Sequence, residues 1–161
     1  MPDNDVATAE RPTAIQDYPY HWSFTTRWND NDIFGHLNNT IYYAAMDTAV
    51  TSWFVQRFGF DPARSPWIAV IVSSSCRFHT SAVFPDLIDV GVRAQRIGRT
   101  SIVWRFGLFR QADGTLLATG EFVHVITERD NPGRPAPIPP ELRGALEQTM
   151  LAALPDADND L

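Results

Sequence analysis

Residues 27–39 read RWNDNDIFGHLNN and lead directly into a helical pattern over residues 40–58. This polar stretch concentrates two carboxylates, an imidazole and several side-chain amides in front of the only long helical pattern in the central part of the chain. The first backbone N–H groups of a helix have no partner within it and attract negative charge. We therefore expect the chemistry of this protein to take place at residues 27–39.

The composition is that of a soluble domain. The chain has 161 residues, 44% of them hydrophobic, which suffices for one core without metals or disulfides. The net charge of −6 and the scattered arginines argue against nucleic-acid binding, because phosphate contacts need a basic face. Cys76 is the single cysteine, no segment resembles a secretory signal, and the longest aliphatic run, residues 68–72, is too short to span a bilayer. We expect a cytoplasmic protein that does not contact membranes.

The helical pattern of residues 40–58 has recognisable ends. Asn38 or Asn39 can cap its N-terminus, and Gly59 suits the left-handed residue that follows a helix. Small residues at positions 41, 45, 48 and 52 form one stripe, and bulkier residues at positions 42, 46, 49 and 53 form another beside it. A helix that is apolar over so much of its girth should be covered by a sheet, and we expect the small stripe to allow close approach.

Strand patterns separated by turn signals follow this helix. We expect strands over residues 20–28, 67–80, 87–97, 101–110 and 115–127, with a hairpin turn at Asp113-Gly114. A strand, a helix and then a run of antiparallel strands predicts an α+β fold in which one antiparallel sheet packs on one helix. The free edges of such a sheet favour a dimer.

Three parts of the chain differ in character. Residues 1–17 are polar, acidic and without periodicity, so we expect them to be disordered. Residues 18–130 form the folded domain. Residues 131–161 comprise a proline-rich connector, a short amphipathic helix over residues 141–154 on the surface, and an acidic tail.

The motif of residues 27–42, Arg-Trp-x-Asp-x-Asp-x-x-Gly-His-Leu-Asn-Asn-x-x-Tyr, resembles the signature of hotdog-fold acyl-CoA thioesterases of the 4-hydroxybenzoyl-CoA thioesterase type. Three further features agree with that family: Gly98-Arg99-Thr100-Ser101 before a strand, Asp113-Gly114 in the next hairpin, and the proline-rich segment after the last strand. The resemblance spans residues 18–140. It implies a hotdog fold, an antiparallel β-sheet wrapped around one central long α-helix, and a homodimer or homotetramer with its sites between subunits.

The same resemblance implies roles for particular residues. Asp32, the second carboxylate of the Asp-x-Asp pair, matches the family's nucleophile or general base on the thioester, and the two routes are not separable from the sequence. The backbone N–H of Asn39 matches the donor to the substrate carbonyl. The segment from His36 also resembles acyl-carrier-protein thioesterases in which the histidine takes part in catalysis, which widens the range of carriers. Gly35, Asn38, Tyr42 and Asp47 complete the expected substrate-binding set.

Each of these residues has a plainer structural interpretation. Asp30 should hold the loop or pair with Arg27, and Tyr42 could pack against the sheet instead of touching substrate. His36 could be a loop donor only, while Asp47, which stands where a glutamate is usual in the family, could pair with an arginine. No cofactor and no metal site is expected, since the four histidines and Cys76 lack ligand spacing.

Other nucleophiles fit the sequence less well. Cys76 and His79 should lie on opposite faces of a strand, residues 73–75 lack a nucleophile elbow, and His124 should be a satisfied core residue.

Two alternative functions remain. One is an acyl-CoA-binding hotdog module without catalysis. The other is a hotdog hydratase, which is disfavoured because its Asp-x-Asn-Pro-x-His segment is missing.

Overall fold

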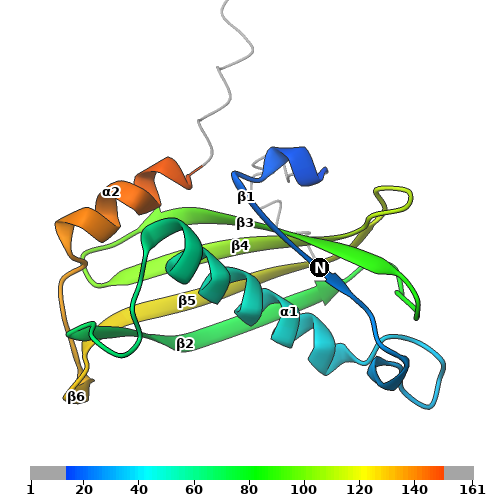
Figure 1. Ribbon diagram of the computed structural model, residues 1–161, viewed down its shortest axis with the longest axis horizontal. Helices are drawn as coiled ribbons and strands as arrows, with labels where there is room; N and C mark the ends of the chain where they lie inside the picture. Colours follow the sequence, from blue (N-terminus) through cyan, green and yellow to red (C-terminus); the bar gives the residue numbers. More distant parts are fainter. Residues whose placement is uncertain (1–13, 151–161) are drawn as a thin grey trace, which may run out of the picture.

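A six-stranded antiparallel sheet forms the body of the protein in the computed structural model, which describes residues 14–150 (Figure 1). The strand order is β1-β3-β4-β5-β2, and β6 pairs with the end of β5. The strands are β1 (Tyr20–Thr25), β2 (Trp67–Phe78), β3 (Leu87–Ile97), β4 (Ser101–Arg110), β5 (Leu116–Glu128) and β6 (Asn131–Pro135). The five predicted strands are thus confirmed, with ends that differ from the prediction by at most three residues. Gly114 in the turn between β4 and β5 has φ +70°, as the predicted hairpin requires.

One long helix crosses a single face of this sheet, here called the inner face (Figure 1). It consists of α1 (Asn39–Ser52) and the π-helical segment η3 (Trp53–Phe58). The Asn38 side chain caps its start by accepting the N–H of Thr40, and Gly59, with φ +81°, ends it. The α+β architecture with a central helix is therefore confirmed, and it is that of a hotdog fold.

The bulky stripe of the helix, not the small one, faces the sheet. The buried residues are Tyr42, Met46, Ala49 and Trp53, whereas Thr48 of the small stripe is exposed. The prediction that the small stripe lets the sheet approach the helix closely was therefore wrong. The close approach comes from the sheet. A Cβ atom at Gly120 of β5 would lie only 2.1 Å from the Met46 sulfur.

Alternate residues of the central strands fill the space under the helix. The inner face of β3 and β4 contributes a fully or almost fully buried set, Ile88, Val90, Val92, Ala94, Ile102, Trp104, Phe106 and Leu108. Those are the residues that strand alternation predicted to point inward. Burial of this single set against α1 and η3 holds the start of the helix, and with it residues 27–38, in a fixed position.

Regular structure begins earlier in the N-terminal part than the sequence predicted. Ile15–Asp17 form a 3-10 turn, η1, so the prediction of disorder was wrong for these residues, while residues 1–13 lie outside the described part. Tyr18 is buried on the outer face of the sheet, the face turned away from the helix. Its ring occupies the space above Gly91 and Gly107, where any Cβ atom would clash.

The C-terminal part is more integrated than predicted. Proline residues of β6 are tolerated because this short strand lies at the sheet periphery, pairing Thr127 with Pro135. Helix α2 (Pro140–Gln148) buries Leu142 and Leu146 completely, so it belongs to the core and is not a surface helix. The end of the predicted helix and the acidic tail, residues 151–161, lie outside the described part. Among residues 14–150 no helix is long and apolar enough to cross a bilayer.

Candidate active site

Residues 27–38 form a compact loop, called the helix-entry loop below, that is built around Asp30. The Asp30 side chain is only 3% exposed and accepts the backbone N–H of Arg27 at 2.7 Å and its guanidinium at 2.8 Å. The hydrogen bond from the Arg27 side chain is the main reason that the pKa of Asp30 is lowered. The Asp30 carbonyl accepts the N–H of Asn38 at 2.8 Å. The structural role predicted for Asp30 is therefore confirmed.

Asp32 sits at the tip of this loop and closes a tight turn. Its Oδ1 accepts the N–H of Phe34 at 2.8 Å and that of His36 at 3.4 Å, and its backbone N–H donates to the His36 carbonyl at 2.8 Å. Within residues 14–150 no hydrogen bond reaches the second oxygen, Oδ2. Gly35 makes the turn possible with φ +77°. The Oδ1 atom of Asp32 is thus held by its own loop, and the Oδ2 atom can bind another partner.

The start of α1, which directly follows the helix-entry loop in the chain, presents an unused donor. Asn38 Oδ1 accepts both the N–H and the hydroxyl of Thr40, at 3.0 and 2.8 Å, and the Asn38 carbonyl accepts the N–H of Ile41. Asn39 is the first helical residue, and its backbone N–H has no acceptor among the described residues. This amide combines an open hydrogen bond with the positive end of the helix dipole.

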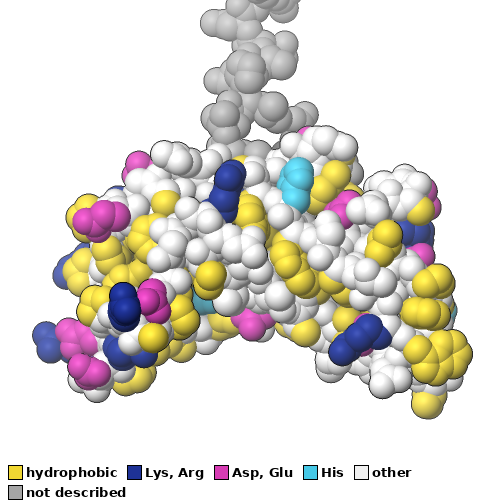
Figure 2. Space-filling model, viewed as in Figure 1, with side chains coloured by type: hydrophobic (Ala, Val, Ile, Leu, Met, Phe, Trp, Pro, Cys, Tyr) yellow, Lys and Arg dark blue, Asp and Glu magenta, His cyan; other side chains and the backbone are white. Residues whose placement is uncertain are grey.

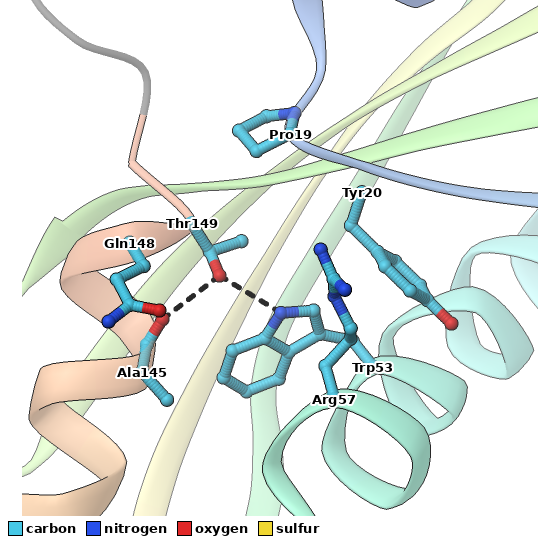
Figure 3. Close-up of a pocket in the computed structure, with 7 residues that line it drawn as sticks. All are labelled: Pro19, Tyr20, Trp53, Arg57, Ala145, Gln148 and Thr149. Carbon is cyan, nitrogen blue, oxygen red and sulfur yellow. Dashed lines mark hydrogen bonds between the residues drawn. The ribbon is translucent and has the colours of Figure 1, made fainter.

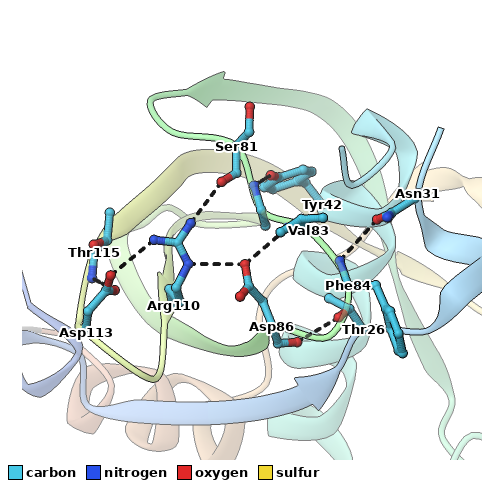
Figure 4. A network of polar contacts seen from close by, with 11 residues as sticks. Thr26, Asn31, Tyr42, Ser81, Val83, Phe84, Asp86, Arg110, Asp113 and Thr115 are labelled. Atoms are coloured by element: carbon cyan, nitrogen blue, oxygen red, sulfur yellow. Dashed lines mark hydrogen bonds and ion pairs between the residues drawn. The ribbon is translucent and has the colours of Figure 1, made fainter. Parts of the chain in front are cut away.

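A second loop, residues 81–86, supports the helix-entry loop from the side (Figure 4). The Ala82 carbonyl accepts the N–H of Leu37 at 2.8 Å, the Ala82 N–H donates to the Tyr42 hydroxyl at 3.2 Å, and the Phe84 N–H donates to Asn31 Oδ1 at 3.2 Å. Sequence reasoning missed this loop because 40 to 53 residues separate the partners.

Arg110 fixes the loop of residues 81–86 in turn (Figure 4). Its side chain donates to Asp86 at 3.1 Å, to Asp113 at 3.2 Å and to the Ser81 carbonyl at 3.0 Å. The hydrogen bond to Asp86 is the largest contribution to the raised pKa of Arg110, so this cation stays charged. The sequence places residues 81–86 between two expected strands, but no local signal in it indicates their contact with Arg110.

The structure brings together only part of the predicted site. Asp32, Gly35, His36 and Asn38 share the helix-entry loop, and Asn39 follows it directly. His36 is exposed and joins Asp32 through backbone groups. Tyr42 is buried with its ring edge-on to Phe78 at 5.1 Å, which places it in the core.

Asp47 lies apart from this group on α1. It is exposed, and no arginine of the described chain forms an ion pair with it.

Large apolar side chains are exposed around the helix-entry loop. Trp28, Ile33 and Phe34 are 76%, 94% and 77% exposed, and Figure 2 shows hydrophobic side chains gathered at this end of the molecule. Single exposed apolar residues need no explanation, but a group of them marks a surface that another molecule covers. The loop that carries Asp32 therefore adjoins a surface suited to an apolar ligand or to a second chain.

A cavity of about 210 Å³ lies at the opposite end of the helix (Figure 3). Its wall contains Trp53, whose indole N–H donates to the Thr149 hydroxyl at 2.9 Å, together with Pro19, Tyr20, Arg57, Ala145 and Gln148. The Thr149 hydroxyl donates onward to the Ala145 carbonyl. This hydrogen-bonded pair fastens α2 to η3. No residue of the helix-entry loop lines the cavity.

The remaining nucleophiles and histidines are isolated from one another. Burial raises the pKa of Cys76 to about 11, and His79 bonds Thr119 at 3.0 Å. His124 is buried, as predicted for a core histidine, and burial lowers its pKa to about 4. Its Nδ1 has no hydrogen-bond partner within residues 14–150, so the prediction that this histidine is satisfied was wrong. Within residues 14–150 no group of His, Cys, Asp or Glu side chains could hold a metal ion.

Comparison with known proteins identifies the family of this chain. A family model described as the thioesterase-like superfamily matches residues 26–146, which include the helix-entry loop, the long helix and most of the sheet. The chain therefore belongs to the thioesterase-like superfamily, and the resemblance seen in residues 27–42 is confirmed.

Solved structures show the same fold. The PA5185 protein from Pseudomonas aeruginosa is 40% identical with a TM-score of 0.82, and the match covers 88% of this chain and 98% of that one. A thioesterase from Thermus thermophilus, solved with coenzyme A and zinc, is 26% identical with a TM-score of 0.70, covering 82% and 95%. A 1,4-dihydroxy-2-naphthoyl-CoA thioesterase from Synechocystis is 16% identical with a TM-score of 0.71, covering 79% and 94%. No protein with a curated description matches the sequence significantly.

Proposed function

We propose that this protein hydrolyses an acyl-CoA thioester to the free acid and the thiol at the helix-entry loop. The observation that carries the proposal is that one loop bears a carboxylate with an uncommitted oxygen, Asp32 Oδ2, and leads directly into a helix whose first backbone N–H, that of Asn39, has no acceptor among the described residues. Family membership supports thioester chemistry, since relatives named as thioesterases share the fold. Two of those relatives are named with coenzyme A or a CoA ester, which favours CoA over acyl-carrier protein as the carrier.

The Asn39 N–H is proposed as the donor to the thioester oxygen. Negative charge develops on that oxygen when the carbonyl is attacked, and a preorganised donor lowers the barrier by about 3 kcal/mol. The Asn38 cap leaves this donor free, because it uses its own side chain for Thr40 and its carbonyl for Ile41. The helix dipole acts in the same direction.

Asp32 is proposed as the group that starts the attack. In one route Oδ2 removes a proton from a water molecule that adds to the carbonyl, and in the other Oδ2 adds to the carbonyl itself. The second route forms a mixed anhydride and expels the thiol, and water then opens the anhydride. In both routes the hydrogen bond from Phe34 N–H to Oδ1 keeps the carboxylate oriented. His36, whose N–H also reaches Oδ1, is proposed to hold the turn from its other side.

A second copy of the chain is proposed to complete the acyl site. Strand β2 pairs only with β5 among the described strands, so its other edge offers unpaired backbone groups. Val72 on this strand is 60% exposed, residues 71–75 are all exposed, and Figure 2 shows the margin of the molecule hollowed along this edge. Pairing of two β2 edges would give a homodimer, and two dimers a tetramer.

The oligomer can be tested by measuring molar mass in solution by light scattering. We expect the mass of a dimer or tetramer for the wild type and a smaller assembly for Val72→Lys, since a lysine on an edge strand opposes strand pairing. A monomeric wild type would contradict the shared site.

One alternative is an acyl-CoA-binding module that does not hydrolyse its ligand. It is favoured by the hydrogen bonds of Asp32 Oδ1, because they bind one oxygen of the carboxylate to its own loop, as in a purely structural turn. The deciding experiment offers acyl-CoA esters of different chain length and aromatic content and measures thiol release with a chromogenic reagent, alongside binding by calorimetry. Hydrolysis that Asp32→Asn abolishes supports the thioesterase. Binding with no thiol release from any ester supports the module.

A further inference from the structure

The loop of residues 81–86 holds the helix-entry loop at three points, which follow one another in opposite order along the two segments. The hydrogen-bonded pairs are Asp86 with Thr26, Phe84 with Asn31, and Ala82 with Leu37, and Figure 4 shows the first two. Thr26 directly precedes the helix-entry loop, and Leu37 lies near its end. Asp32 lies between the second and the third point, so the segment that carries its carboxylate is fixed on both sides.

One side chain, that of Arg110 at the end of β4, joins the two ends of the loop of residues 81–86 (Figure 4). Its Nε donates to the Asp86 carboxylate at 3.1 Å, and its Nη2 donates to the Ser81 carbonyl at 3.0 Å. The side chains of Arg110 and Asp86 are only 20% and 18% exposed, so little water competes for this ion pair. Arg110 therefore stabilises this loop across its whole length.

The loop of residues 81–86 keeps some attachments that do not involve Arg110. The Ala82 N–H donates to the Tyr42 hydroxyl at 3.2 Å. The Val83 N–H donates to the Asp86 carboxylate at 3.1 Å within the loop itself. Loss of the guanidinium should therefore loosen the loop without unfolding it, and the helix-entry loop should loosen with it.

We propose that Arg110 is a positioning residue for thioester hydrolysis, which holds the Asp32 carboxylate in place through residues 81–86. The inference rests on the function proposed above, because it concerns the same reaction. A displacement of a reacting group by about 1 Å can lower a rate about 100-fold, even when the substitution lies far from the chemistry. Arg110 acts through two successive sets of hydrogen bonds, one to the loop of residues 81–86 and one from that loop to the helix-entry loop.

Thiol release from the best acyl-CoA ester, measured on the full-length protein over a range of ester concentrations, tests this role. In Arg110→Gln we expect kcat to fall about tenfold or more while KM changes less than about threefold, because the attack depends on the position of Asp32 more strongly than ester binding does. Asp86→Asn removes the same ion pair from its other side and should lower kcat as well. The double variant should be no slower than the slower single variant, since both substitutions break one contact.

Two controls separate positioning from general stability. Asp113→Asn removes the third hydrogen bond of Arg110, which leads to the turn before β5 and not to the loop of residues 81–86, so kcat should change less than about twofold. Leu146→Ala opens a cavity under α2, at the opposite end of the long helix, and lowers the stability of the whole fold. At a temperature at which thermal unfolding shows every variant to be folded, Leu146→Ala should keep kcat within about twofold of the wild type.

Amide hydrogen exchange gives a measurement that does not depend on activity. The N–H of Leu37 donates to the Ala82 carbonyl at 2.8 Å, and it should exchange about tenfold faster in Arg110→Gln than in the wild type. The N–H of Ala136 donates to the Ile126 carbonyl at 2.8 Å in a distant part of the sheet and should exchange at the wild-type rate. Faster exchange at Leu37, together with a lower kcat and a nearly unchanged KM, supports the role of Arg110.

The contrary results are distinguishable from one another. A wild type that releases no thiol from any ester overturns the proposed function, and this role with it. An active wild type whose Arg110→Gln variant keeps more than about half of its kcat overturns the role of Arg110 alone. The role is likewise overturned if kcat falls without faster exchange at Leu37, or if Leu146→Ala lowers kcat as much as Arg110→Gln, because lost stability would then explain both.

Discussion

Asp32→Asn separates the chemical role of Asp32 from its structural role. The carboxylate accepts the Phe34 N–H at 2.8 Å through Oδ1, and an asparagine carries an amide oxygen that can occupy the same position. The turn should therefore survive, and the free energy of unfolding should fall by less than about 1 kcal/mol. For a chain of this length that corresponds to a melting temperature lowered by less than about 4 °C. The amide cannot remove a proton or attack a carbonyl, so kcat should fall about 100-fold or more.

The assay combines thiol release from the best acyl-CoA ester with thermal unfolding on the same preparation. Asp130→Asn is the matched control, because it makes the same change at an exposed position in the turn between β5 and β6 and should alter neither quantity. Asp32→Ala should lose activity and also stability, about 1–2 kcal/mol, since the turn loses its acceptor. An Asp32→Asn variant that keeps more than about a third of the wild-type kcat would refute the catalytic role, given the usual size of such effects.

Three further predictions concern stability. Asp30→Asn should lower the unfolding free energy at pH 7 by about 2 kcal/mol. The pKa of Asp30 in the folded state lies below its ordinary value of 3.8. Urea titrations should therefore show that the difference in unfolding free energy between wild type and variant shrinks as the pH falls below 3.8 and is lost once the pH passes the folded-state pKa. His124, with its pKa lowered to about 4, stays neutral when folded. The unfolded state takes up a proton on this histidine as the pH falls, so the unfolding free energy of the wild type should decrease by about 2 kcal/mol between pH 7 and pH 5. The His124→Leu variant should not show this decrease. Gly120→Ala should cost about 1–3 kcal/mol through contact with Met46, whereas Gly144→Ala, in open space on α2, should not destabilise.

The outcome for the site shows where local reasoning stops. Asn38 as a cap and Asp30 as the partner of Arg27 were predictable, since both act within three residues of their own position. The turn at Asp32 closes over two to four residues and lies within the same reach. The support from Ala82, by contrast, comes from a loop more than 40 residues away and had no local signal.

The sequence by itself determined the elements of this protein. The periodicity of residues 40–58, the cap at Asn38, the stop at Gly59 and the turn at Asp113-Gly114 fix the helix and the strand ends, because each depends on interactions over four residues or fewer. Tertiary structure decided which stripe of the helix is covered, since that depends on the space above Gly120. It also decided that α2 joins the core and that Arg93 stands opposite Arg105, because strand register and helix docking are set by contacts between distant segments.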